Sequence, residues 1–134
     1  MALEWTIDLA TGVDDIDNQH KELFNRINSL LDACREGKGR EEVKKTILFL
    51  DDYVVTHFAN EERYMQRFDY PEYPAHTAMH KQFMRSFSEL KAQFETEGAG
   101  VSLVVSTNRA VVEWLQNHIR KVDTALGGFL KTRV

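Results

Sequence analysis

Four long stretches of the chain are almost free of proline and glycine, and each repeats apolar residues at the spacing of an α-helix. Helix-breaking residues gather between these stretches and near both ends of the chain. Amphipathic helices joined by short connections pack as an antiparallel bundle. We therefore predict an all-α fold, an antiparallel up-down-up-down four-helix bundle with an N-terminal arm. The expected helices cover approximately residues 14–35, 40–68, 74–94 and 101–122.

Polar residues near the starts of the helices predict how the helices begin. Asp14 or Asp17 is expected to cap the first helix, and Ser102 is expected to cap the fourth. Pro74 suits the first turn of the third helix, where its missing N–H costs nothing. The first twelve residues carry several large apolar side chains, so we expect an ordered arm that packs on the bundle.

Length, charge and cysteine content exclude several classes of protein. The chain has 134 residues, which suits a single domain, 1–134, around one core. Its formal net charge of −4 argues against a nucleic-acid partner or an anionic membrane surface. Cys34 is the only cysteine, so neither an internal disulfide nor a zinc-thiolate site is expected. With no secretion signal and no bilayer-length apolar stretch, we expect a cytoplasmic protein without membrane insertion.

The histidines form a pattern that involves all five of them. His57 is followed four residues later by Glu61, and His76 is followed four residues later by His80. A spacing of four rotates about 40° and rises about 6 Å along a helix, so both members of each pair share one face. That face also carries the apolar residues, so these polar side chains need partners inside the bundle.

The other two histidines complete the pattern on the remaining helices. His20 lies on the apolar face of the first helix, and His118 precedes Asp123 by five residues on the fourth. Five residues rotate about 140° in a regular α-helix, so the side chains of His118 and Asp123 would diverge. We therefore predict a local widening of the fourth helix there, as a π-type turn.

Each of these residues also has a simpler explanation when it is taken alone. A single histidine on an apolar helix face is more often a hydrogen-bonded core residue than a metal ligand. Glu62 is expected to be either a solvated residue or a second acceptor behind the site. The joint pattern favours a metal site, because every histidine and two carboxylates converge at one level of one bundle.

Four motifs carry a resemblance to a known family. They are DNQH at 17–20, YVVTHFANEE at 53–62, HTAMH at 76–80 and WLQNHIRKVD at 114–123. The chain resembles the hemerythrin family, in its bacterial single-domain form, over nearly its whole length. The resemblance implies a non-haem centre of two iron ions with an oxo or hydroxo bridge. The implied metal ligands are His20, His57, Glu61, His76, His80, His118 and Asp123.

The resemblance also implies how the ligands are divided. One iron would have His76, His80 and His118, the other would have His20 and His57, and Glu61 and Asp123 would bridge them. Such a set leaves one position open on the iron with two histidines, where a small molecule can bind. In the family this molecule is dioxygen. The residues expected to line its pocket are Leu115, Ile119, Phe24 and Phe58.

Reversible dioxygen binding, for storage, delivery or sensing, is therefore the leading hypothesis, and it describes a binding protein with no catalytic residues. The alternatives are a di-iron redox enzyme of the peroxidase or nitric oxide reductase type, and an iron or redox sensor. The chain has no Glu-x-x-His motif of the kind that ferritin-like di-iron proteins use, which favours binding over oxygen activation. The expected partner is dioxygen, and an unidentified protein recipient of the oxygen is left open.

Overall fold

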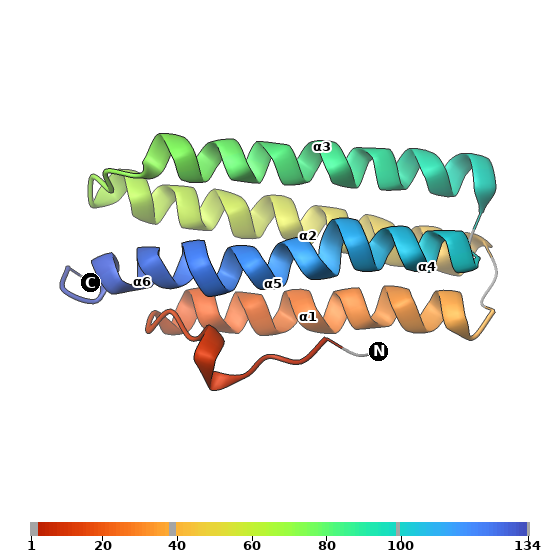
Figure 1. Ribbon diagram of the computed structural model, residues 1–134, viewed down its shortest axis with the longest axis horizontal. Coiled ribbons are helices and arrows are strands. Elements are labelled where there is room, and N and C mark those ends of the chain that lie inside the picture. The colour runs from red at the N-terminus through yellow and green to blue at the C-terminus, as the bar shows by residue number, and fades with distance from the viewer. Residues whose placement is uncertain (1–2, 38–39, 99, 134) are drawn as a thin grey trace.

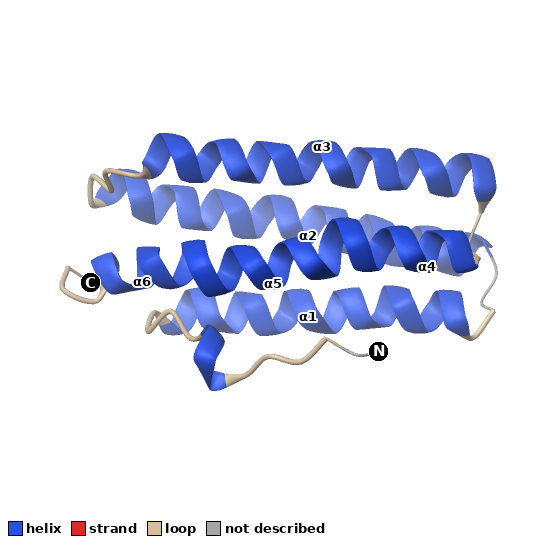
Figure 2. Cartoon of the chain, viewed as in Figure 1, coloured by secondary structure: helices blue, strands red, loops and turns tan. Residues whose placement is uncertain are grey.

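The computed structural model describes residues 3–37, 40–98 and 100–133, and these residues form helices with no strand among them. Three long helices are followed by a fourth rod of consecutive helical segments, and neighbouring rods run in opposite directions (Figures 1 and 2). The predicted antiparallel four-helix bundle is confirmed. Within the described residues, no helix is both long and apolar enough to cross a membrane. The first three helices are α1 (Asp14–Arg35), α2 (Arg40–Arg67) and α3 (Tyr73–Glu97).

The fourth rod alternates between α-helical and π-helical hydrogen bonding. Its segments in chain order are α4 (Val101–Thr107), η2 (Asn108–Glu113), α5 (Trp114–His118), η3 (Ile119–Asp123) and α6 (Thr124–Leu130). Both η2 and η3 are π-helical. The widening predicted between His118 and Asp123 is confirmed by η3, whereas η2 has no counterpart in the sequence prediction. A π-turn adds a residue to the turn, so side chains five apart return to one face.

The helix starts differ from the predicted caps. Val13 occupies the N-cap of α1 and Gly100 that of α4, and neither start has a side-chain cap hydrogen bond. The predictions that Asp14 or Asp17 caps the first helix and that Ser102 caps the fourth are therefore wrong. These residue types favour helix starts, but Asp17 accepts hydrogen bonds from Thr11 instead, and Ser102 is bonded to Gln93 and Glu97. Pro74 does lie in the first turn of α3, as predicted.

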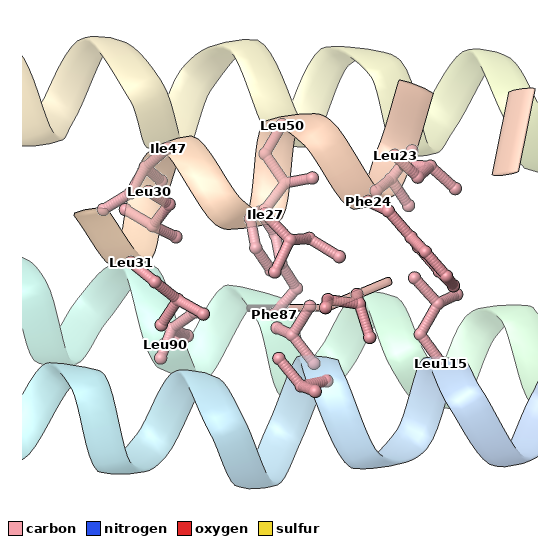
Figure 3. Packing of buried hydrophobic residues seen from close by; sticks show 14 of the residues in the cluster. Leu23, Phe24, Ile27, Leu30, Leu31, Ile47, Leu50, Phe87, Leu90 and Leu115 are labelled. Atoms are coloured by element: carbon pink, nitrogen blue, oxygen red, sulfur yellow. The ribbon is translucent and has the colours of Figure 1, made fainter. Parts of the chain in front are cut away.

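The buried apolar residues form two clusters separated along the bundle. The larger one includes Leu23, Phe58 and Leu115, and Figure 3 shows part of its packing. The smaller one includes Ile16 and Leu126 near the other end of the same helices. On α1, for example, the predicted ligand His20 lies between Ile16 of the smaller cluster and Leu23 of the larger one, and the other predicted ligands gather at the same level of the bundle. The bundle therefore has a buried polar layer between two apolar layers.

Candidate metal centre

All seven predicted ligands are buried, and each helical rod contributes at least one of them. The most exposed is His118, at 4%. His20 comes from α1 and His118 from α5. The others are His57 and Glu61 from α2, His76 and His80 from α3, and Asp123 from η3.

Glu61 lies between two groups of histidines and presents a different oxygen to each. Its Oε2 is 3.1 Å from His20 Nε2 and 2.9 Å from His57 Nε2. Its Oε1 is 3.4 Å from His76 Nε2 and 3.2 Å from His80 Nε2. A carboxylate that divides its oxygens in this way has the geometry of a bridge between two neighbouring ions.

Asp123 repeats this arrangement from the opposite side of the bundle. Its Oδ2 is 3.1 Å from His20 Nε2. Its Oδ1 is 3.0 Å from His76 Nε2 and 3.1 Å from His118 Nε2. The π-turn of η3 is what brings Asp123 and His118 to the same centre. Two overlapping clusters result, and in each the candidate ligand atoms lie within 4.8 Å of one another.

Several of these ligand atoms lack a hydrogen-bond partner among the described residues, although they face oxygens at hydrogen-bond distance. Close approach without hydrogen-bond alignment means that imidazole nitrogens and carboxylate oxygens point at a shared space and not at each other. Leaving buried polar atoms unpaired is costly, and coordination of a cation would pair all of them. The donor set therefore fits metal ions. The unpartnered atoms include Nε2 of His57, His76, His80 and His118, Glu61 Oε1 and Asp123 Oδ1.

Comparison with known proteins agrees with this geometry. Residues 11–130 match the family model described as the Hemerythrin HHE cation binding domain. The chain belongs to the hemerythrin family. Because this family is described by its binding of cations, the buried cluster is the candidate metal centre of the chain. The structure brings together every ligand position that the family resemblance implied.

Individual relatives extend the match to nearly the whole chain. A bacteriohemerythrin from Methylococcus capsulatus is 38% identical over 93% of this chain and 94% of its own length. One from Pseudomonas aeruginosa is 39% identical over 90% of this chain and 76% of its own length. A crystal structure of wild-type hemerythrin superposes with a TM-score of 0.84 at 36% identity, covering 96% of this chain and 97% of the other. The hemerythrin fold therefore extends over almost the whole molecule.

The charges within the centre control its protonation when no metal is bound. Burial alone lowers the pKa of His20, but the hydrogen bonds and negative charges of Asp123 and Glu61 outweigh it and raise the pKa to about 10. Burial also lowers the pKa of His76, but the nearby Asp123 and Glu61 carboxylates raise it to about 9. Burial raises the pKa of both carboxyl groups, yet the surrounding histidines hold each below its usual value. The carboxylates are therefore charged and ready to bind a cation at neutral pH.

Hydrogen bonds outside the centre orient two of the histidines. Nδ1 of His57 is 2.8 Å from Gln19 Oε1, and Nδ1 of His80 is 2.9 Å from Glu62 Oε2. If each Nδ1 carries the proton, each Nε2 is left free to bind a metal ion. Glu62 is therefore an acceptor behind the site, one of the two roles that the sequence allowed. Sequence reasoning missed Gln19, although it stands next to His20 in the DNQH motif.

Aromatic rings stack on two of the histidines. The ring of Phe58 stacks on His80, with centroids 3.8 Å apart and planes 5° apart. The ring of Trp114 stacks on His118, with centroids 4.4 Å apart and planes 13° apart. Stacking restricts ring rotation and keeps water from these two ligands.

The four predicted pocket residues are all buried in the larger apolar cluster. Leu115 is 2% exposed and Phe24 is 2% exposed, and Figure 3 shows Phe24 extending toward Leu115. Ile119 is fully buried at the start of η3. The structure thus places an apolar wall beside the polar layer. Whether these side chains line a ligand position remains a prediction.

Proposed function

We propose that this chain binds dioxygen reversibly at a non-haem di-iron centre. The observation that carries the proposal is the division of both carboxylates between two groups of histidines. A structural site for one ion would need only one group. The proposed ligands are His76, His80 and His118 for one iron, His20 and His57 for the other, and Glu61 and Asp123 as bridges.

Iron is the metal that best suits these donors and this purpose. Imidazole and carboxylate ligands with an open position are typical of redox-active non-haem iron. When bound, the ferrous pair would supply the electrons by which dioxygen is held. The position with two histidines has fewer protein ligands, so the proposal assigns dioxygen to that side.

The contribution of the protein is to keep the oxygen position dry and the ligands fixed. Water and acidic groups near a reactive oxygen species promote irreversible oxidation, so their exclusion favours reversibility. Leu115, Ile119, Phe24 and Phe58 are the proposed wall, and all four are buried. Gln19 and Glu62 orient the rings of His57 and His80 by hydrogen bonds to their Nδ1 atoms.

The proposed role is storage, delivery or sensing of oxygen by a binding protein and not by a catalyst. A ferrous centre is maintained most easily in a reducing setting, so we place this role in the cytoplasm. A protein that receives the oxygen would be a further partner.

Anaerobic loading followed by oxygen exposure tests the proposal. The protein would be titrated with ferrous iron without air, and the iron bound per chain would be measured. Two ions per chain, and a visible absorption band that appears with dioxygen and disappears on purging, are the expected results. Continuous consumption of dioxygen with a reductant would identify a redox enzyme instead, and a protein that binds no iron would contradict the proposal.

A further inference from the structure

The N-terminal arm, residues 3–13, joins the first helix to the last part of the chain. The backbone of Leu3 and the side-chain amide of Asn28 on α1 exchange two hydrogen bonds, of 2.7 and 2.8 Å. Farther along the arm, Asp8 accepts a hydrogen bond of 3.1 Å from Arg120 on η3. Leu9 is buried in the larger apolar cluster together with residues of both helices. The arm therefore contacts both α1 and the fourth rod, and Figure 1 shows it running alongside α1.

Asp17 fastens the arm to α1. Its Oδ1 accepts hydrogen bonds of 2.8 Å from both the backbone N–H and the hydroxyl of Thr11. Its Oδ2 accepts a longer bond of 3.4 Å from the N–H of Gly12. Asp17 and Thr11 are both buried, at 8% and 1% exposure, so this charged acceptor is shielded from water. The residue that the sequence suggested as a helix cap is in fact the anchor of the arm.

The arm packs closely against α6 at Gly127 because glycine has no side chain. A Cβ at this position would lie 2.7 Å from both the Cα and the carbonyl carbon of Thr11, and closer still to its oxygen. These are backbone atoms, which cannot turn aside as a flexible side chain can. The neighbouring Gly128 is exposed, and a Cβ there would meet nothing within 4 Å. Only Gly127 therefore allows α6 to pack directly on Thr11.

These contacts bear on the candidate metal centre through two of its ligands. Asp17 precedes His20 by three residues on α1, about one helical turn. Gly127 follows Asp123 by four residues, again about one turn. His20 and Asp123 meet across the seam, with Nε2 and Oδ2 3.1 Å apart. Thr11 therefore lies between two helices one turn away from the point where their ligands meet.

We propose that Thr11, Asp17 and Gly127 form a latch, the Thr11 latch, whose role is to position His20 against Asp123 and so to complete the metal position with two histidines. This inference rests on the proposed di-iron centre. The metal position with three histidines depends less on the latch, because His118 and Asp123 belong to the same rod. The distance between His118 and Asp123 is set by the π-turn of η3. The distance between His20 and Asp123 is set by the packing of α1 against the fourth rod.

The adjacent glycines provide a matched test. Gly127→Ala and Gly128→Ala add the same methyl group one residue apart, and each would be titrated with ferrous iron without air. We expect Gly128→Ala to match the wild type, with two ions per chain. Gly127→Ala should keep the first ion within about twofold and weaken the second by at least about tenfold, the scale of lost ligand orientation.

A second measurement reports on the arm directly. Amide hydrogen exchange of residues 3–11 in the metal-free proteins should be faster in Gly127→Ala than in Gly128→Ala or the wild type. Equal affinity for both ions in Gly127→Ala and the wild type would overturn the proposal. Equal weakening of both ions would also overturn it, because that result indicates general destabilisation.

Asp17→Asn tests the latch without added bulk. It removes the negative charge that Thr11 and Gly12 share, so it should weaken the second ion in the same direction as Gly127→Ala, by a smaller factor. Asp14→Asn, in the exposed first turn of α1, is its control and should behave as the wild type. If Gly127→Ala does not fold, unchanged binding of the second ion by Asp17→Asn is sufficient to reject the latch. A wild-type protein that binds no second ion would reject the di-iron centre itself, a result distinct from failure of the latch alone.

Discussion

The two halves of the candidate centre are held in different ways. In the half with three histidines, His80 and His118 each stack on a neighbouring aromatic ring. In the half with two, His20 and His57 meet edge to face at 4.7 Å. Each half has one outer hydrogen bond, from His80 to Glu62 in the first and from His57 to Gln19 in the second. The first half therefore differs by its two stacked rings, and the second by the proposed Thr11 latch. The half proposed to bind dioxygen is thus the half with fewer ligands and fewer stacked rings.

Removal of the bridge that both halves share should have the largest effect. Glu61→Gln keeps the shape of the side chain but replaces a charged oxygen that faces histidines of one half with an amide group. We expect the affinity for ferrous iron to fall more than about 100-fold at both positions, beyond the loss typical of outer residues. Anaerobic titration measures this loss. Retention of one tight ion would contradict a bridging role for Glu61.

Removing the outer hydrogen bonds one at a time should weaken iron binding at one position more than at the other. Gln19→Ala removes the partner of His57, and Glu62→Ala removes the partner of His80. Each should weaken iron binding by about 10-fold to 100-fold. The comparison predicts that Gln19→Ala affects mainly the position with two histidines and Glu62→Ala mainly the other. The same titration measures both variants, and identical binding profiles would mean that the halves are not independent.

A charge in the apolar wall should act on the oxygen position and not on iron binding. Leu115→Glu places a carboxyl group at a site that is 2% exposed and so draws water toward the centre. We expect oxidation to the diferric form to be about tenfold faster, equivalent to roughly 1.4 kcal/mol in the barrier. The decay of the oxygenated spectrum measures the rate, with Leu115→Met as a control that keeps the wall apolar. An unchanged rate would remove Leu115 from the proposed pocket.

The smallest expected effect is a pH dependence of the metal-free protein. The pKa values of about 10 for His20 and about 9 for His76 lie above the ordinary 6.5. Protonation of these residues therefore stabilises the fold fully below pH 6.5, and the contribution is lost as pH rises through 9 and 10. The melting temperature should fall by several degrees between pH 7 and pH 10.5, on the scale of a few kcal/mol. Thermal unfolding followed by circular dichroism measures this fall.

The iron-loaded protein is the control for this pH dependence. Bound ions would replace the protons on His20 and His76, so its melting temperature should show less of the alkaline fall. An equal fall in both forms would mean that other groups cause it.

The sequence predicted the features that depend on spacing within one helix. The pair His57 and Glu61 shares a helix face because four residues make about one turn, so no tertiary information was needed. The irregular spacing of His118 and Asp123 also predicted the π-turn of η3, since only a widened turn brings both side chains to one centre.

The sequence did not predict the features that depend on contacts between elements. Asp17 has the residue type of a helix cap, but its acceptor role toward Thr11 depends on where the arm runs. Gly127 has no special backbone angle to mark it, and its role becomes visible only when Thr11 lies against it. The other π-helical segment, η2, carries no pair of predicted ligands, so nothing in the spacing of the sequence indicated it.

Repeated oxygenation is the most direct test of the central claim. The protein loaded with two ferrous ions per chain would be exposed to dioxygen, purged with inert gas and exposed again, while uptake is measured by an oxygen electrode and the visible spectrum. Reversible binding predicts one dioxygen taken up per pair of irons, its release on purging, and nearly the same uptake in the next cycle. Uptake that is not released, with iron left in the ferric state after the first exposure, would contradict the account.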